Sequence, residues 1–226
     1  MNGIIIIDKP NGLTSHDVVL FLRRRFGIKK VGHAGTLDPM ATGVLVLLLG
    51  EATKLSNSFI CDDKEYEGVL RLGIKTRTCD KEGEVLSTRD ISGISDKTIK
   101  DVAASFLGTI DQVPPMFSAL KRDGKKLYKL ARKGIEIKLE PRKVTIHELD
   151  IKNIELPDVW FKVGCSKGTY IRKLAEDIGD RIGCGAHLAA LRRTRSGRFR
   201  IEDSVAFKEL EGLNNKSLEE RVQSIQ

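Results

Sequence analysis

The chain has 226 residues, of which 40% are hydrophobic and 31% are charged, a composition typical of a folded globular protein. Its longest apolar run, residues 44–49, has the length of one buried strand and is too short to span a bilayer. The first residues carry no basic segment ahead of a short apolar run, so they do not predict a secretion signal. Four scattered cysteines without a Cys-x-x-Cys pair, and only four histidines, indicate reduced thiols rather than disulfides or a zinc site. We therefore expect a cytoplasmic protein.

The net charge of +8 is unevenly distributed along the chain. Residues 121–143 hold ten Lys and Arg against three Asp and Glu, and residues 165–200 hold nine against three. The rest of the chain is net acidic. A solvated helix face would explain either stretch alone, but two concentrated basic stretches favour contact with a phosphate backbone.

The first predicted elements are two buried strands separated by a helix and a loop. Residues 4–7 form a short apolar run that ends in a turn-rich stretch and predicts a strand. Thr14 or Ser15 can cap a helix whose apolar positions recur every fourth residue as far as Gly27. A glycine-spaced loop at residues 32–43 then leads into the second strand, at residues 44–49.

The later elements alternate irregularly. Residues 65–72 alternate in polarity and predict a half-buried strand with Tyr66 facing inward. Further elements are expected as a helix at residues 99–107 ended by Gly108, a short basic helix at 127–131, strands at 144–151 and 159–165, and a helix at 171–182. Because no regular βαβ rhythm appears, we expect an α+β fold with a mixed, largely antiparallel central sheet flanked by helices. No linker or repeat divides residues 1–226, which predicts a single catalytic domain.

Asp38 is the first candidate for chemistry. It lies in the glycine-rich loop before the strand at residues 44–49 and is followed by Pro39, which favours an extended conformation for the aspartate. A carboxylate at the mouth of a buried strand is well placed for catalysis, although an aspartate in a loop more often forms a turn. The loop lacks the Gly-Lys-Ser/Thr ending of a P-loop and the Gly-x-Gly-x-x-Gly spacing, so ATP and NAD chemistry are not expected.

Three further residues have both a functional and an ordinary interpretation. Arg172, near the start of a helix, would keep a buried acid ionised if it faced one, but an arginine on a basic helix more often faces solvent. Tyr66 is more often a core residue than a catalyst. His33 suits stacking against a nucleic-acid base and suits the surface equally well.

Residues 32–45, Gly-His-Ala-Gly-Thr-Leu-Asp-Pro-Met-Ala-Thr-Gly-Val-Leu, resemble the catalytic motif of the TruB family of tRNA pseudouridine synthases. Other segments resemble family motifs in the same order along the chain, at residues 8–15, 112–128, 165–172 and 183–188. Dyskerin-type relatives share the aspartate motif. The block at residues 112–121 is closer to the bacterial stand-alone enzyme.

The resemblance implies a pseudouridine synthase fold and an enzyme that isomerises the T-loop uridine at position 55 of tRNA. It implies that Asp38 is the catalytic acid, that Tyr66 contacts the target nucleotide, and that Arg172 is the ion-pair partner of Asp38. His33 would fill the space that the flipped base leaves. The remaining residues implied to bind the substrate are Tyr170 and Leu191.

This isomerisation breaks the N1–C1′ glycosidic bond, turns the uracil and rejoins it through C5, without redox change or group transfer. No cofactor and no metal are therefore expected. The target lies inside a folded loop, so it has to be flipped into a pocket. Ionised Asp38 would attack C1′ or, alternatively, uracil C6, with Tyr66 as a base that removes a proton from C2′ in a glycal route or from C5 at the end. The sequence leaves these routes open.

The expected partner is the T-arm stem-loop of tRNA, with no membrane, no obligatory protein partner and a monomeric enzyme. The residues expected on the RNA backbone are Lys121, Lys125, Lys126, Arg192 and Arg193. One alternative is a non-catalytic RNA-binding or folding module, which would be free to lose Asp38, Tyr66 or Arg172. Another is a guide-RNA-dependent, dyskerin-like subunit, which would need a C-terminal PUA domain, and no such domain is expected in residues 1–226.

Overall fold

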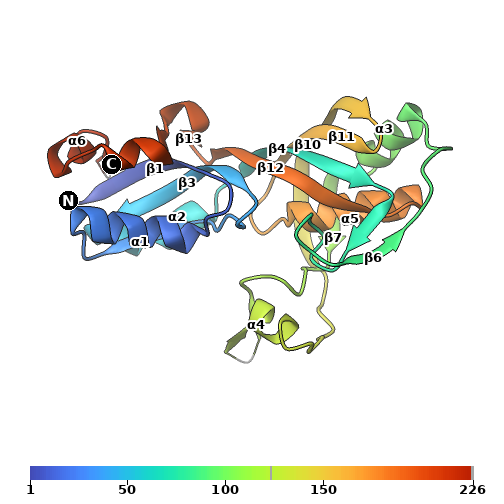
Figure 1. Ribbon diagram of the computed structural model, residues 1–226, viewed down its shortest axis with the longest axis horizontal. Coiled ribbons are helices and arrows are strands. Elements are labelled where there is room, and N and C mark those ends of the chain that lie inside the picture. The colour runs from blue at the N-terminus through green and yellow to red at the C-terminus, as the bar shows by residue number, and fades with distance from the viewer. Residues whose placement is uncertain (123, 225–226) are drawn as a thin grey trace. The chain divides into compact units, whose positions relative to one another are not determined.

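The computed structural model describes residues 1–122 and 124–224 (Figure 1). The chain divides into two compact units, Met1–Glu67 with Leu191–Gln226 (unit 1) and Gly68–Ala190 (unit 2). The division falls inside strands β4 (Lys64–Leu72) and β12 (Ala186–Ser196), so each of these strands contributes to both units. Mostly antiparallel strands with flanking helices confirm the predicted α+β class. The single catalytic domain stays a prediction.

Unit 1 is built on two long neighbouring strands, β1 (Gly3–Lys9) and β3 (Thr42–Leu49). They pair antiparallel along their whole length, from Gly3 opposite Leu49 to Lys9 opposite Gly43. Two further pairings are parallel: β14 (Val205–Ala206) pairs with β1, and the last part of β12 pairs with β3. Two are antiparallel: β2 (Val31–Ala34) pairs with β3, and β13 (Phe199–Arg200) pairs with β12.

The core of unit 1 covers both faces of β1. The four isoleucines at residues 4–7 are all buried, although successive side chains of a strand point to opposite faces. Helix α1 (Ser15–Phe26) lies beside β1 and β3 in Figure 1 and buries the apolar positions that its sequence spacing predicted. It ends at Gly27, as predicted, with φ 68°. The short elements that complete unit 1 are the 3₁₀ helices Gly50–Leu55, Ile201–Asp203 and Phe207–Glu211 and the helices α2 (Ser56–Ile60) and α6 (Asn215–Glu219).

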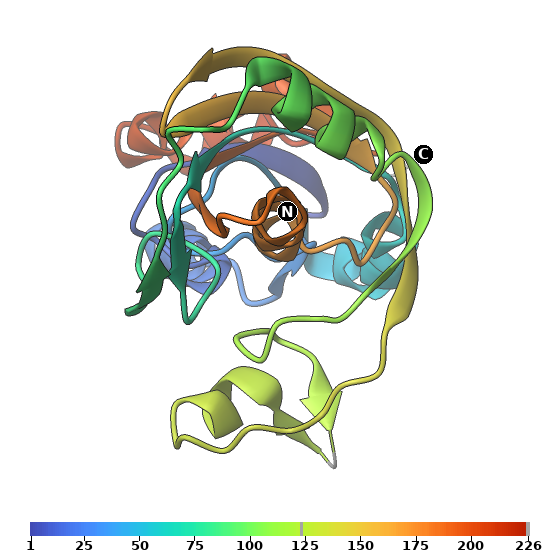
Figure 2. The same cartoon turned by 90° about the vertical axis from the view of Figure 1, so that its right-hand side faces the viewer.

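Unit 2 contains a curved sheet in the order β12-β4-β11-β10-β7. Strand β10 (Arg142–Glu155) pairs antiparallel with β11 (Asp158–Cys165) on one side and with β7 (Gly108–Gln112) on the other. Helix α5 (Ile171–Ile182) lies in the hollow of this sheet, beside α3 (Asp96–Ala104), as Figure 2 shows. A separate hairpin is formed by β5 (Ile74–Thr76) and β6 (Val85–Thr88).

The helix predicted at residues 99–107 ends earlier than expected. Ala104 is its last residue, Leu107 is 48% exposed rather than part of the core, and Gly108 begins β7 with φ +89°. The Ser105 hydroxyl donates to the carbonyl of Val102 at 2.6 Å, and such a side-chain bond to the last turn competes with helix continuation. The prediction that Leu107 belongs to the helix was therefore wrong.

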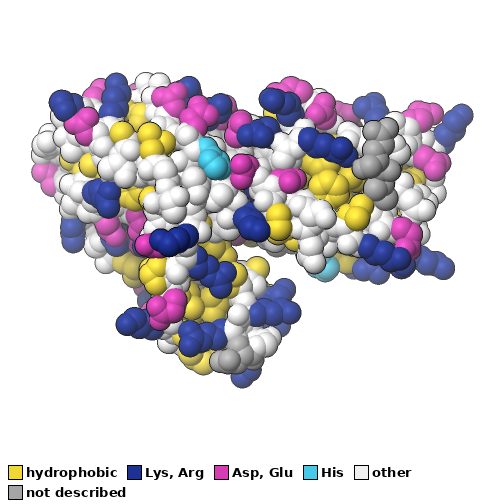
Figure 3. Space-filling model, turned by 180° about the vertical axis from the view of Figure 1, so that it is seen from behind, with side chains coloured by type: hydrophobic (Ala, Val, Ile, Leu, Met, Phe, Trp, Pro, Cys, Tyr) yellow, Lys and Arg dark blue, Asp and Glu magenta, His cyan; other side chains and the backbone are white. Residues whose placement is uncertain are grey.

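A basic arm, residues 113–141, connects β7 to β10 in unit 2. It carries a hairpin of β8 (Lys121–Arg122) and β9 (Lys125–Lys126) and the helix α4 (Leu127–Ala131), which the sequence predicted. In Figures 1 and 2 the arm projects away from the strands of unit 2. Its lysines and arginines are exposed and spread over its surface (Figure 3). Across the described part of the chain, no helix combines the length and apolarity needed to cross a membrane.

Candidate active site

Asp38 lies in unit 1 on the aspartate loop, residues 35–41, which connects β2 to β3. The side chain of Asp38 is half-buried, whereas Leu37 before it and Met40 and Ala41 after it are buried anchors. The carbonyl of Asp38 accepts a hydrogen bond from the Ala41 amide at 3.0 Å. Buried residues on both sides of Asp38 thus anchor the loop, and Asp38 itself is only half-buried.

The residues on either side of Asp38 are held by the segment at residues 9–15. The Leu37 amide donates to the Ser15 hydroxyl at 2.8 Å, and that hydroxyl donates to the Leu37 carbonyl at 3.1 Å. The Pro39 carbonyl accepts from the Gly12 amide at 2.9 Å and from Lys9 Nζ at 3.2 Å. These bonds hold the peptide group between Leu37 and Asp38 and, beyond Asp38, the carbonyl of Pro39.

Lys9 is a buried residue beside the aspartate loop whose bonding the sequence reasoning missed. Its side chain is 0% exposed, and Nζ also donates to the carbonyls of Pro10 at 2.8 Å and Leu13 at 2.6 Å. A buried ammonium is tolerated only when its hydrogen-bonding capacity is satisfied, and these carbonyls supply the acceptors. A lysine in a turn-rich stretch gives no sequence signal of such burial.

Arg193 was expected on the RNA backbone, and the structure argues against that role. The residue is 1% exposed; its Nε donates to the Val44 carbonyl at 2.7 Å and its Nη2 to the Gly35 carbonyl at 3.0 Å. Gly43 lies against its backbone, because a Cβ there would meet the Arg193 carbonyl oxygen at 2.2 Å. Arg193 therefore braces the base of the aspartate loop. The error arose because charge alone does not distinguish a surface arginine from a buried one.

The other expected residues of unit 1 have varied environments. Arg192 is partly exposed and pairs with the Asp8 carboxylate at 2.8 Å, so its role on RNA stays a prediction. Tyr66 is buried on the inner face of β4, as predicted. Leu191 is buried in β12, and His33 is half-buried in β2. The substrate contacts of these three residues stay predictions.

Arg172 lies in unit 2, in the first turn of α5, and does not face solvent. It is 5% exposed, and its guanidinium donates to two backbone carbonyls, that of Thr78 at 2.9 Å and that of Phe117 at 2.8 Å. Its Nη1 also lies 3.6 Å from a carboxylate oxygen of Asp80. We call Thr78, Asp80 and Phe117 the arginine cradle. The pairing of Arg172 with Asp38 stays a prediction.

Asp80, between β5 and β6, is a second residue that the sequence reasoning missed. Its carboxylate accepts from the Thr78 hydroxyl at 2.5 Å and from the Glu82 amide at 3.1 Å. Cys79 before it has φ 60°, a conformation that non-glycine residues rarely adopt. Burial first, and then the negative charge of Glu176, raise the pKa of the Cys79 thiol to about 12. Threonine and aspartate in this stretch signal a turn, but nothing in the sequence pairs that turn with Arg172.

Tyr170 directly precedes α5 and is half-buried. Its backbone is gripped by the side chain of Gln112 at the end of β7. The Tyr170 amide donates to Gln112 Oε1 at 2.8 Å, and Gln112 Nε2 donates to the Tyr170 carbonyl at 3.2 Å. Because Gln112 is 1% exposed, this paired contact is shielded from water and fixes the entry to the helix that carries Arg172.

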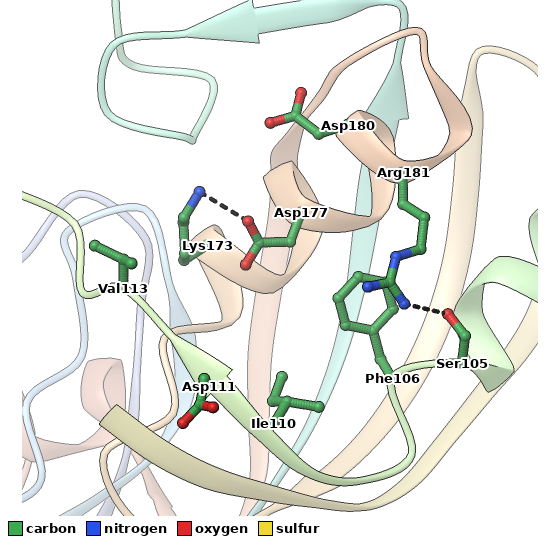
Figure 4. Close-up of a pocket in the computed structure, with 9 residues that line it drawn as sticks. All are labelled: Ser105, Phe106, Ile110, Asp111, Val113, Lys173, Asp177, Asp180 and Arg181. Carbon is green, nitrogen blue, oxygen red and sulfur yellow. Dashed lines mark hydrogen bonds and ion pairs between the residues drawn. The ribbon is translucent and has the colours of Figure 1, made fainter. Parts of the chain in front are cut away.

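A cavity of about 840 Å³ in unit 2 contains none of the expected site residues (Figure 4). The guanidinium of Arg181 lies 4.7 Å from the Phe106 ring centre and bonds the Ser105 hydroxyl at 2.8 Å. Asp177 pairs with Lys173 at 2.8 Å, and Asp180 pairs with Lys75 at 2.8 Å. The two aspartates are thus paired with lysines, and the Arg181 guanidinium lies against an aromatic ring. No cluster of three or more His, Cys, Asp or Glu suited to a metal occurs within residues 1–122 and 124–224.

The basic arm offers an exposed cationic surface. Lys121, Lys125 and Lys126 are exposed, and Tyr128 has Lys126 Nζ at 5.8 Å and the Arg132 guanidinium at 5.5 Å from its ring centre. Cations around an aromatic ring suit both phosphates and the face of an unstacked base. The RNA contacts expected from the three lysines stay predictions.

Comparison with known families identifies the fold. A model described as TruB family pseudouridylate synthase (N terminal domain) matches residues 23–171, and one described as tRNA pseudouridylate synthase B C-terminal domain matches residues 172–225. The chain belongs to the TruB family. It is 51% identical to tRNA pseudouridine synthase B of Syntrophotalea carbinolica over 93% of this chain and 69% of that protein. It is 46% identical to the protein of the same name from Opitutus terrae, over 98% and 92% respectively.

Solved structures that are similar to this chain include chains from an H/ACA RNP and from a Cbf5 complex. The chain is similar to one from a Cbf5–Nop10–Gar1 complex, with a TM-score of 0.74 and 32% identity over 98% of this chain. A chain from an H/ACA RNP bound to a substrate RNA containing 2′-deoxyuridine gives a TM-score of 0.72 and 30% identity over 98% of this chain. The TruB-family chain spans 60% and 56% of the lengths of these two chains. These matches confirm the predicted pseudouridine synthase fold.

Proposed function

We infer that this chain is a tRNA pseudouridine synthase that isomerises the T-loop uridine at position 55. The observation that carries this function is the aspartate loop, whose backbone is held by hydrogen bonds before and after Asp38. A nucleophile is effective when it is held in a productive orientation before the substrate arrives. Family membership and close relatives named tRNA pseudouridine synthase B support the same reaction.

In the proposed mechanism, the target uridine leaves the T-loop stack and enters a pocket formed by Tyr66, Tyr170 and Leu191, while His33 fills the space that it leaves. Unstacking costs a few kcal/mol, which contacts to the flipped base offset. Asp38 then acts as the nucleophile, at C1′ or at uracil C6, and Tyr66 removes a proton in the later steps. Arg172, with its guanidinium oriented by the arginine cradle, would keep Asp38 ionised.

The sequence identities between this chain and its relatives favour the stand-alone enzyme over a guide-dependent subunit. Relatives named tRNA pseudouridine synthase B are about 50% identical to this chain, whereas the chains from the H/ACA RNP and the Cbf5–Nop10–Gar1 complex are 30–32% identical. We therefore propose a cytoplasmic, monomeric enzyme that binds the T-arm through the basic arm and needs no protein partner. The contacts of the basic arm would supply affinity that weakens with salt, while the pocket would choose the site.

The test uses a T-arm stem-loop RNA and a matched RNA with cytidine at position 55. Pseudouridine is mapped by carbodiimide modification and primer extension. The wild-type protein should give, on the first RNA alone, the stop one nucleotide 3′ of position 55 that reports pseudouridine there. Asp38→Asn keeps the shape of the side chain and removes its charge, so it should bind the RNA and form no product. Failure of the wild-type protein, or undiminished product with Asp38→Asn, would overturn the proposal.

A further inference from the structure

Ser15 bonds both backbone groups of one residue of the aspartate loop. Its hydroxyl accepts from the Leu37 amide at 2.8 Å and donates to the Leu37 carbonyl at 3.1 Å. Ser15 is 1% exposed and Leu37 is also buried, so water does not compete for these bonds. A single hydroxyl thereby satisfies two buried polar groups that lie 22 residues away along the chain.

The start of α1 does not need this hydroxyl. Thr14 caps the helix, because its side chain accepts from the Asp17 amide at 3.1 Å and the Asp17 carboxylate accepts from the Thr14 amide at 2.8 Å. This reciprocal pattern is a complete capping box. Thr14 therefore caps the helix, and the hydroxyl of the adjacent Ser15 bonds the aspartate loop.

The Leu37 carbonyl belongs to the peptide group that carries the amide of Asp38. Any rotation of that peptide plane changes the direction of the Asp38 Cα–Cβ bond and moves the carboxylate. On the far side of Asp38, the Pro39 carbonyl is held by the Gly12 amide and by Lys9 Nζ. Ser15 is thus the side chain that fixes the plane entering Asp38, and a misplacement of about 1 Å is enough to slow an enzyme about 100-fold.

We propose that Ser15 is a positioning residue that sets the orientation of the Asp38 carboxylate for the isomerisation. The proposal rests on the function inferred for Asp38. It predicts that loss of the hydroxyl slows the chemical step and leaves RNA affinity and the helix intact. A merely structural serine would instead affect stability, with activity lost only in proportion to unfolding.

Ser15→Ala is compared with Thr14→Ala, which removes a hydroxyl one residue away that bonds Asp17 and not Leu37. Thr14→Ala should lower Tm by about 2–4 °C through loss of the cap, and its rate should stay within threefold of wild type. Ser15→Ala should lower the single-turnover rate about 10- to 100-fold on saturating T-arm RNA, with Kd within threefold. Rates are measured at a temperature at which every variant is fully folded.

The rate of Leu37 amide hydrogen exchange, measured by NMR, gives a readout that is independent of activity. Exchange should accelerate in Ser15→Ala and stay unchanged in Thr14→Ala. A Ser15→Ala rate within threefold of wild type, or no greater loss than Thr14→Ala shows, would overturn the proposal. If Ser15→Ala does not fold, Ser15→Cys keeps the volume with a weaker hydrogen bond, and a wild-type rate there also overturns it. If the wild-type protein makes no pseudouridine, the proposed function fails, and Leu37 exchange alone then tests the bonding of the loop.

Discussion

The aspartate loop of unit 1 and the arginine cradle of unit 2 fix their central residues by opposite kinds of bonding. Around Asp38, side chains hold the backbone, through Ser15 on Leu37 and Lys9 on Pro39. Around Arg172, the backbone holds the side chain, through the carbonyls of Thr78 and Phe117. The first arrangement leaves Asp38 half-buried, whereas the second buries Arg172.

This difference fits the different tasks proposed for the two groups. A nucleophile has to reach the substrate, so only its support can be rigid. A cation that stabilises a neighbouring charge works best when desolvated and fixed in direction, which the planar guanidinium and its several donors allow. Substitutions in the aspartate loop and in the arginine cradle are therefore expected to have different effects, and exchanged effects would contradict the roles proposed for Asp38 and Arg172.

The largest effect is expected when the guanidinium fork is lost. Arg172→Lys keeps the positive charge but cannot reach both carbonyls of the cradle, so at least one of the two part-buried acceptors loses its donor. The single-turnover rate should fall about 100- to 1,000-fold, with RNA affinity within threefold. Arg181→Lys, on the exposed part of the same helix, is the matched control and should keep the wild-type rate. A loss of RNA binding without a loss of rate would contradict the role of Arg172.

A smaller effect is expected when the grip on Tyr170 is removed. Gln112→Leu leaves the part-buried amide and carbonyl of Tyr170 without their partner, which should destabilise the fold by about 1–3 kcal/mol and lower kcat about 10-fold. Gln112→Glu can still accept from the Tyr170 amide but cannot donate to its carbonyl, so it should fall between wild type and Gln112→Leu. Urea denaturation and steady-state kinetics measure the two quantities. Equal kcat values for wild type and both Gln112 variants would show that Gln112 does not position Tyr170.

The basic arm should affect affinity and leave the chemical step unchanged. Lys125 and Lys126 are exposed, and replacing both with Ala should reduce the slope of log K against log salt by about 1 for each phosphate that the variant no longer neutralises. Replacing Lys97 and Lys100 of α3 with Ala removes the same charge elsewhere in unit 2 and is the control. Filter binding between 50 and 200 mM salt (about the range in which such contacts dominate) makes the measurement. Equal slopes for the two double variants would exclude these lysines from the RNA backbone.

The smallest effect concerns the thiols. Cys61 is exposed, whereas burial raises the pKa of Cys79 to about 12, so at pH 8 a thiol reagent should label Cys61 and leave Cys79 unmodified in the native protein. The sign for stability follows from the same shift. The folded state holds the thiol proton of Cys79 to a higher pH than the ordinary pKa of 9.0 would allow. The contribution of Cys79 to the free energy of unfolding is therefore complete below pH 9 and is lost as the pH rises toward 12. Mass spectrometry after timed alkylation checks the labelling, and rapid labelling of Cys79 would show that the turn before Asp80 opens.

The sequence by itself determined the periodic elements and the central acid. The apolar spacing of α1 and α5, the strands β1, β3 and β11, and the inward direction of Tyr66 follow from local pattern, because periods of 3.6 and 2 residues record which face is buried. The resemblance in the aspartate loop then singled out Asp38.

Tertiary structure decided which charges are buried and which groups they bond. Arg193 and Arg192 are adjacent in β12, but one braces the aspartate loop and the other reaches Asp8. Thr14 and Ser15 carry the same functional group, but one caps α1 and the other holds Leu37. Asp80 approaches Arg172 from a distant part of the chain, a proximity that no local pattern encodes. Residue type fixes what a side chain can bond, and the packing of distant segments fixes what it does bond.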